Sequence, residues 1–202
     1  MPLRIVLRYS DASPASLQMR SMERLAQADR ETLGLRFGEP CDPRRLVELY
    51  DVRQIIESLT DYAAFLNWDL GDVVTVFDGM DAYSAVTFAT SVSDLWMLVN
   101  PGHERPRRTF TIAHEFGHLV LGHRAVGVDR IDGGLAKPRY SDAQEHEAYA
   151  YALALLLPYA PLLQFLEAGA SEQAIARHYG VSVEALHMRL KLAGLWETRR
   201  KT

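Results

Sequence analysis

The stretch RTFTIAHEFGHLVLGH, Arg108–His123, contains two histidines and a glutamate in the arrangement H-E-x-x-H. Its apolar pattern predicts a helix from about Pro106 to Leu121. His114 and His118 lie four positions apart, so they project from one face of that helix, one turn apart. Two imidazoles at this spacing can bind one tetrahedral zinc ion. Glu115 lies about 100° around the helix, where it can reach a metal-bound water without ligating the metal.

The bare motif is a weak signal, because isolated buried histidines are usually hydrogen-bonded core residues. Its context favours a metal site. Two imidazoles and a carboxylate on a strongly apolar helix are costly to desolvate without a partner. Gly117 lies between the two histidines, which indicates a close approach of a sheet or a metal, and Gly122 is a typical helix stop.

A site with two histidines needs a third protein ligand, and the segment SDAQEHEAYAYALALLLP, Ser141–Pro158, supplies candidates. Ser141 or Asp142 can cap a helix whose first turns carry Glu145 and Glu147. Acidic residues are favourable in a first helical turn for electrostatic reasons alone. Because both stand where the helix becomes wholly apolar, we expect at least one to be a ligand.

Two further histidines are rival ligands. His123 follows the first helix and His146 lies between the two glutamates. We interpret each as an ordinary surface residue, or as a neighbour of a ligand rather than a ligand itself.

The composition is that of a globular protein with one domain of ordinary size. The chain has 202 residues, of which 48% are hydrophobic and 24% charged, and its net charge of -4 argues against a polyanion-binding chain overall. Cys41 is the only cysteine, which excludes an intramolecular disulfide and fits a reducing compartment. The apolar run Ala148–Leu163 is too short for a membrane span and is interrupted by two prolines. We therefore expect a cytoplasmic protein without a membrane partner.

Three zones are expected along the chain. Residues 1–40 form an N-terminal extension with a helix from Pro14 to about Leu33, whose apolar positions include Leu17, Leu25 and Ala28. Residues 41–166 form the main domain and residues 167–202 a helical tail. Glycines and a proline between residues 34 and 40 mark the first boundary.

Within the main domain, the fold class expected is α+β and mainly helical, with a small antiparallel sheet beside the metal helix. Asp42 followed by Pro43 is a good helix start, and the apolar positions after it suggest one or two helices up to about Phe65. Three short runs rich in β-branched and aromatic residues then predict a meander with turns at 78–79 and 91–94. The runs are Val73–Phe77, Tyr83–Ala89 and Leu95–Val99.

The tail, from Ser171 onward, has the pattern of a helix-turn-helix, with a turn at Tyr179-Gly180 and a second helix from about Val181. Residues 171–202 carry six Lys and Arg against three Glu, a charge of +3. That excess is weak evidence for phosphate contacts. We favour a hairpin packed on the main domain over DNA binding.

Together, FTIAHEFGHLVLGH and EHEAYAYALALLLP resemble the ImmA/IrrE-type metallo-endopeptidases. These pair a helix of the form F-T-x-A-H-E-x-G-H-L with a later helix E-x-E-A-[ND]-x-F-A-x-x-L-L-x-P. The likeness covers roughly Asp42 to Leu195 and includes a strand that ends in Asn, here LWMLVN. The paired motifs are far more specific than H-E-x-x-H alone.

The resemblance implies a zincin-like peptidase with Zn²⁺, or Mn²⁺, as cofactor. His114 and His118 would be ligands, Glu115 the general base, and Glu145 the third ligand, with Glu147 as the fallback. An exposed edge strand beside the metal helix would pair with an extended substrate, as in similar zinc peptidases.

The sequence departs from the family pattern at two positions. Tyr149 stands where Asn or Asp is usual, which removes a hydrogen-bonding partner expected near a ligand histidine, and Tyr151 replaces a usual Phe. We interpret Tyr149 as a core residue, with a phenol near the reacting carbonyl as the alternative. Further candidates for oxyanion contacts are His103, Arg139, Tyr140 and His146.

The resemblance also implies a regulatory role in stress or mobile-element responses, with a transcriptional repressor as the protein substrate. One competing interpretation is a non-hydrolytic regulator that binds a repressor or DNA through a structural metal helix. Glu115 separates the two, because a structural site needs no general base. A weaker alternative is the toxin half of a toxin–antitoxin pair.

Overall fold

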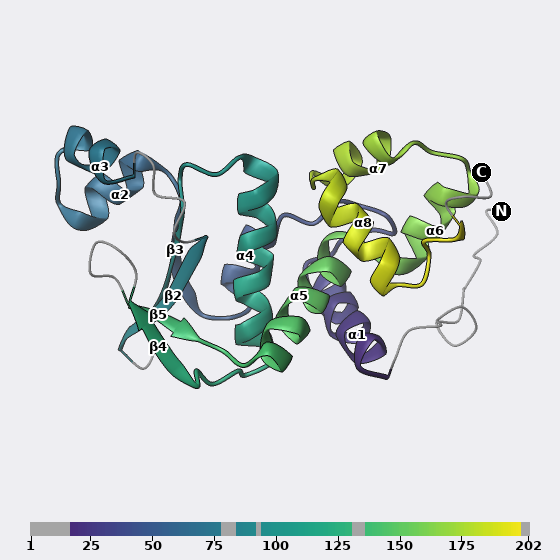
Figure 1. Cartoon of the computed structure of the whole chain (residues 1–202), viewed down its shortest axis with the longest axis horizontal. Coiled ribbons are helices and arrows are strands. Elements are labelled where there is room, and N and C mark those ends of the chain that lie inside the picture. The colour runs from purple at the N-terminus through teal and green to yellow at the C-terminus, as the bar shows by residue number, and fades with distance from the viewer. Residues whose placement is uncertain (1–16, 78–83, 92–93, 131–135, 199–202) are drawn as a thin grey trace.

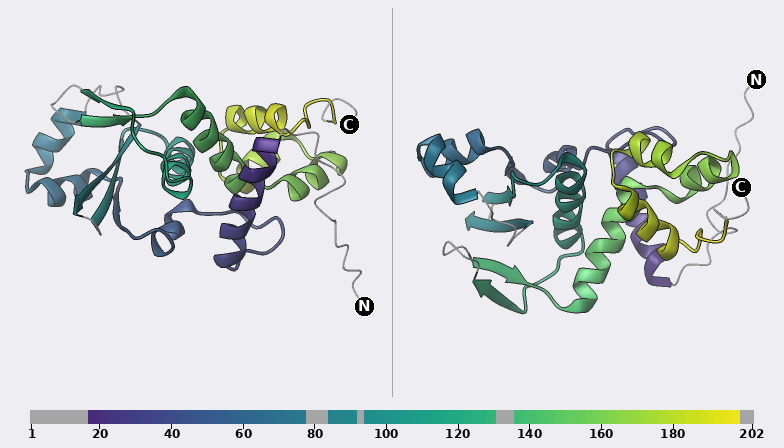
Figure 2. Two further views of the ribbon diagram at one scale, coloured as in Figure 1. Left: turned by 90° about the horizontal axis from the view of Figure 1, so that it is seen from below. Right: turned by 45° about the horizontal axis from the view of Figure 1, so that its top comes forward.

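The computed structural model describes residues 17–77, 84–91, 94–130 and 136–198. The chain is a mixed α+β protein and mainly helical, as the sequence predicts. Its described residues form two small sheets where one was expected. Helix α5 (Asp142–Leu156) runs through the middle of the molecule, as Figures 1 and 2 show. Helix α4 (Arg105–Val120) and the sheets lie on one side of α5, while α1 (Leu17–Thr32) and the C-terminal helices lie on the other.

The two motif-bearing helices pack directly on each other. Helix α5 begins at a capping box formed by Ser141 and Gln144, and its apolar body is almost wholly buried. Helix α4 approaches so closely that a Cβ atom on Gly117 would lie 2.8 Å from the Cα and carbonyl oxygen of Ala148. The missing side chain of Gly117 therefore allows close contact with α5, whereas the sequence suggested close contact with a sheet or a metal. This packing sets the distance between the two halves of the site.

The main sheet has the strand order β1-β3-β2. Strands β2 (Ala85–Ser91) and β3 (Asp94–Val99) pair antiparallel, which confirms two strands of the predicted meander. The third strand is β1 (Val52–Ile56), parallel to β3 and lying in a segment that the sequence analysis assigned to helix. Because this pairing joins segments some 40 residues apart, local pattern did not reveal it.

The predicted strand Val73–Phe77 is wrong, since this segment belongs to helix α3 (Leu70–Phe77). Val73 is fully buried in a second small core, which also contains Ile56, Tyr62 and Leu98. That packing outweighs the weak β preference of a valine-rich run. The turn predicted at Asp78-Gly79 lies outside the described residues.

Two further helical segments flank β1 in the chain, and a hairpin follows α4. The 3-10 helix η1 (Pro43–Glu48) is capped by Asp42 as expected, and α2 (Leu59–Leu66) begins after Ser58. Strands β4 (Gly127–Arg130) and β5 (Ala136–Arg139) pair antiparallel, and the sequence analysis did not predict them.

Helix α1 buries a different face from the one predicted. Leu25 and Ala28 are exposed, while Met19, Met22 and Ala26 belong to the main core. Three polar residues share the buried face and find partners there: Glu23, Asp29 and Arg30. The predicted apolar stripe is wrong because these polar side chains form hydrogen bonds and ion pairs with other helices, which allows them to be buried.

The C-terminal helices are α6 (Tyr159–Glu167), α7 (Glu172–Tyr179) and α8 (Val183–Leu192). Gly180 has a φ of 65° and makes the turn between α7 and α8, as the sequence indicates. Both helices bury apolar residues in the main core. No single helix in the described part of the chain is long and apolar enough to cross a membrane; only α5 and α6 together, bent by 58°, reach that length and composition.

Candidate metal and catalytic site

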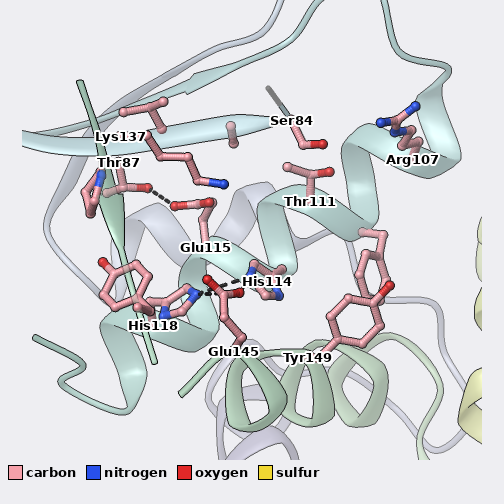
Figure 3. A pocket seen from close by; sticks show the side chains of 15 residues that line it. Ser84, Thr87, Arg107, Thr111, His114, Glu115, His118, Lys137, Glu145 and Tyr149 are labelled. Atoms are coloured by element: carbon pink, nitrogen blue, oxygen red, sulfur yellow. Dashed lines mark hydrogen bonds and ion pairs between the residues drawn. The ribbon is translucent and has the colours of Figure 1, made fainter. Parts of the chain in front are cut away.

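Three side chains from α4 and α5 converge on one point (Figure 3). The Nε2 atoms of His114 and His118 lie 3.1 Å apart, and Oε2 of Glu145 lies 3.1 Å from His114 Nε2 and 3.7 Å from His118 Nε2. One donor atom from each residue lies within 4.8 Å of the other two. The structure thus brings together the three residues that the sequence nominated as ligands.

This arrangement fits a metal ion by its donor types and spacing. In tetrahedral zinc sites the ligand atoms lie about 2.0–2.1 Å from the metal, and hence about 3.3 Å from one another. The three spacings of 3.1, 3.1 and 3.7 Å agree with such an edge. Three protein ligands leave a fourth position for water or substrate, as in catalytic zinc sites.

The protonation states also suit a metal. The pKa of His118 is lowered to about 3, mainly because the ring is buried and secondly because His114 lies nearby. Hydrogen bonding to His114 lowers the pKa of Glu145 below its usual value. Near neutral pH His118 is therefore uncharged and Glu145 ionised, which are the forms that bind a cation.

Glu115 lies beside the triad on the buried side of α4. Burial raises the pKa of its carboxyl group above the ordinary value, and the hydroxyl of Thr87 donates a 2.6 Å hydrogen bond to its Oε2 that works against this rise. A buried carboxylate with a raised pKa is a stronger base than an exposed one. Thr87 belongs to β2, so the sheet fixes the orientation of this group.

A second layer of contacts surrounds His118. The ring of Tyr140 stacks on it at 3.8 Å between centroids with an interplanar angle of 16°. Its Nδ1 atom lies 3.0 Å from Nδ1 of His123, and His123 Nε2 lies 3.1 Å from Oε2 of Glu147. Glu147, the fallback ligand, is not in the triad; the two glutamates are about 200° apart around α5, so each faces a different histidine.

The triad lies on the wall of a cleft of about 370 Å³. Ser84 and the start of β2 form one side of the cleft, helices α4 and α5 form another, and β5 contributes Lys137 and Pro138. Figure 3 shows Glu115, His114 and Lys137 directed into this space. The cleft therefore exposes the triad, Glu115 and a strand edge to the same ligand.

The other nominated residues divide into two groups. Tyr140 and Tyr149 line the cleft, and Tyr149 packs between Phe110 and the ring of His114, with centroid distances of 4.7 and 5.6 Å. His103, Arg139 and His146 are not among the described residues that line it. Arg139 pairs with Asp129 instead, and His146 lies exposed with Nδ1 bonded to the carbonyl of Asp142.

Several residues of the cleft were not predicted from the sequence. Thr87 gave no signal, because only the strand pairing places it against Glu115. Lys137 arrives on β5, and a signal for that hairpin was present: Asp132-Gly133-Gly134 is a typical turn sequence between strands. Phe110 and Arg107 lie one and two turns before His114 on α4, and helical spacing alone could have placed them along the same cleft.

Comparison with protein families gives an independent result. The model of the IrrE N-terminal-like domain, Peptidase M78, matches residues 72–191, more than half of the chain. The chain belongs to this peptidase family. The match spans α4, the β4–β5 hairpin and α5, and so includes every residue of the triad. No curated protein and no solved structure matches the chain significantly.

Proposed function

We propose that this protein is a zinc-dependent endopeptidase with a regulatory role, and that it cleaves a protein such as a transcriptional repressor. The observation that carries the proposal is the convergence of His114, His118 and Glu145 in one cleft with the buried carboxylate of Glu115. Membership of a metallopeptidase-type family supports the reaction class.

In this proposal the residues of the cleft have separate roles in the reaction. His114, His118 and Glu145 would hold the metal, which supplies a water of lowered pKa and a positive charge beside the scissile carbonyl. Glu115 takes a proton from the attacking water and delivers it to the leaving amine. Its burial favours the protonated state, and the bond from Thr87 stabilises the ionised state, so the carboxyl is balanced for both steps.

The substrate would bind as an extended strand. Strand β2 is one of the two edge strands in the order β1-β3-β2, and residues 84–87, at and just before its start, line the cleft opposite α4. Main-chain hydrogen bonds to such an edge bind a peptide irrespective of its side chains. Tyr140, Tyr149 and Lys137 then surround the scissile bond and are the candidates for donors to the developing oxyanion.

DNA binding by the α7–α8 hairpin remains the less favoured role. Arg189, one of the six basic residues counted in the tail, is fully buried and pairs with Glu23 of α1. It contributes no charge to a phosphate-binding surface, which supports packing as the main role of the hairpin.

The proposal is tested by metal content and one substitution. Purified protein should carry about one Zn²⁺ or Mn²⁺ per chain by metal analysis, since a single triad is proposed. That metal should be lost in His118→Ala and retained in Glu115→Gln. Incubated with a repressor encoded by a neighbouring gene, the wild type should cleave it and Glu115→Gln should not. Full activity of Glu115→Gln would support the non-hydrolytic interpretation instead.

A further inference from the structure

Beyond the three ligands, His123 and Glu147 form a hydrogen-bonded pair that reaches the back of one of them. Nδ1 of His118 lies 3.0 Å from Nδ1 of His123, whose Nε2 lies 3.1 Å from Oε2 of Glu147. The side chain of His123 is only 6% exposed, so water competes little for these contacts. The three residues form a line that leads from the cleft to the protein surface at Glu147.

The backbone holds His123 in this place. Helix α4 ends at Val120, Gly122 just after it has a φ of 61°, and the amide of His123 then donates a 3.0 Å bond back to the carbonyl of His118. This is the usual left-handed helix stop, which turns the chain back over the last turn. The imidazole of His123 is therefore fixed beside His118 by main-chain geometry, while Glu147 approaches it from α5.

Metal ligation through His118 Nε2 would fix the direction of these hydrogen bonds. The Nε2 atom of His118 faces the triad, so as a ligand it must present its lone pair there and carry its proton on Nδ1. That proton can only be donated to the Nδ1 lone pair of His123. His123 then carries its own proton on Nε2 and donates it to the carboxylate of Glu147. Each step fixes the tautomer of the next residue.

We propose that His123 and Glu147 are positioning residues that set the tautomer and ring orientation of His118 for metal binding. The inference rests on the proposed metal site. In metalloproteins, losing such a partner of a ligand histidine weakens metal binding by about 10–100-fold. This also assigns separate tasks to the glutamates of EHEA: Glu145 faces the metal position and Glu147 the supporting histidine.

Zinc affinity, measured by competition with a chelator on the full-length protein, tests this inference. His123→Phe should bind zinc about 10–100-fold more weakly than the wild type. Glu147→Ala should weaken binding in the same direction. The double variant should bind no more weakly than His123→Phe, because Glu147 acts only through His123. Asn places an oxygen near the position of Nδ1, so His123→Asn should recover most of the affinity and exclude a loss of fold as the cause.

The C-terminal hairpin offers a matched control. His187 and Glu172 form a similar pair, with Nε2 and Oε2 2.8 Å apart, away from the cleft. His187→Phe and Glu172→Ala should leave zinc affinity unchanged. Nitrogen-15 NMR of the zinc-loaded protein should show His118 protonated at Nδ1 and His123 at Nε2.

The outcomes separate this inference from the proposed function. If His118→Ala abolishes zinc binding but His123→Phe binds zinc like the wild type, the positioning role is wrong and the metal site stands. Reversed tautomers, or losses that multiply in the double variant, contradict the inference as well. If His118→Ala binds zinc normally, the proposed metal site itself fails.

Discussion

Glu115 is the residue where the proposed catalytic role and stability conflict most directly. Its side chain is buried at the edge of the cleft, beside the ionisable side chains of His114, Lys137 and Glu145, and burial raises its pKa. A charge in such a place costs free energy unless it is fully paired. Thr87 offers one hydrogen bond, which compensates only in part. A carboxylate retained at this cost is expected where a base is needed.

Glu115→Gln should therefore stabilise the metal-free protein at pH 7.5, by at least about 1 kcal/mol, the order of the cost of a partly satisfied buried polar group. Because the folded-state pKa is raised, stability from this residue is present at low pH and lost as the pH rises above the ordinary carboxyl value. The gain should vanish near pH 3, well below the ordinary carboxyl pKa, where Glu115 is protonated in both states. Urea unfolding at the two pH values measures the difference. A wild type that is the more stable at pH 7.5 would contradict the argument.

At the scale of elements, the sequence predicts helices and strands correctly where the signal is local. It fails where a partner far along the chain determines the secondary structure. Helices α4 and α5 were predicted from caps and apolar periodicity, and their packing brings together the three nominated ligands. Strand β1 was missed because its pairing partner is β3, far along the chain. The valine-rich run of α3 predicts a strand, but Val73 packs in a small core that no local sequence pattern reveals, and this packing favours a helix.

Gly117→Ala tests the contact between α4 and α5. Alanine has the better helix propensity, by about 1 kcal/mol, so an open site would gain stability. Here the new Cβ would lie 2.8 Å from backbone atoms of Ala148, which cannot move aside without shifting α5. We expect a net loss of about 1–3 kcal/mol in thermal or urea unfolding, together with weaker zinc binding.

Gly71→Ala in α3 is the matched control. There the new Cβ would meet only the end of the Asp69 side chain, at 3.1 Å. A side-chain tip can move, so stability should change by less than about 1 kcal/mol. An equally stable or more stable Gly117→Ala variant would show that the two helices are not fixed by this contact.

At the scale of the whole molecule, polar residues join the N-terminal helix to the rest of the chain. Asp29 of α1 accepts 2.5 Å hydrogen bonds from the hydroxyls of Tyr50 and Tyr151. Tyr151, which departs from the family pattern, thus uses its extra hydroxyl to bind α1. Glu23 pairs with the fully buried Arg189 of α8, whose Nε also donates to the carbonyl of Leu157. Sequence alone could not find these pairs, since a charged residue on a helix is usually read as solvent-facing.

Arg189→Met should destabilise the protein by about 3–5 kcal/mol, because it removes the positive charge that pairs with the buried carboxylate of Glu23. Adding Glu23→Gln should recover much of the loss, since neither charge then remains buried. The free energy of unfolding in urea measures both variants. Arg24→Met, at an exposed position of α1, should change stability by less than about 0.5 kcal/mol. A loss that is purely additive in the double variant would mean that the pair is not coupled.

The central claim, that Glu115 drives hydrolysis at the metal site formed by His114, His118 and Glu145, is tested most directly by N-terminal proteomics. Cells that produce the wild-type chain are compared with cells that produce Glu115→Gln at the same level and with the same zinc content. The account predicts new protein N-termini, in one or a few proteins such as a repressor, that appear only with the wild type. The claim would be contradicted if the two kinds of cells showed identical sets of N-termini under conditions in which the wild-type chain alters repressor-controlled expression.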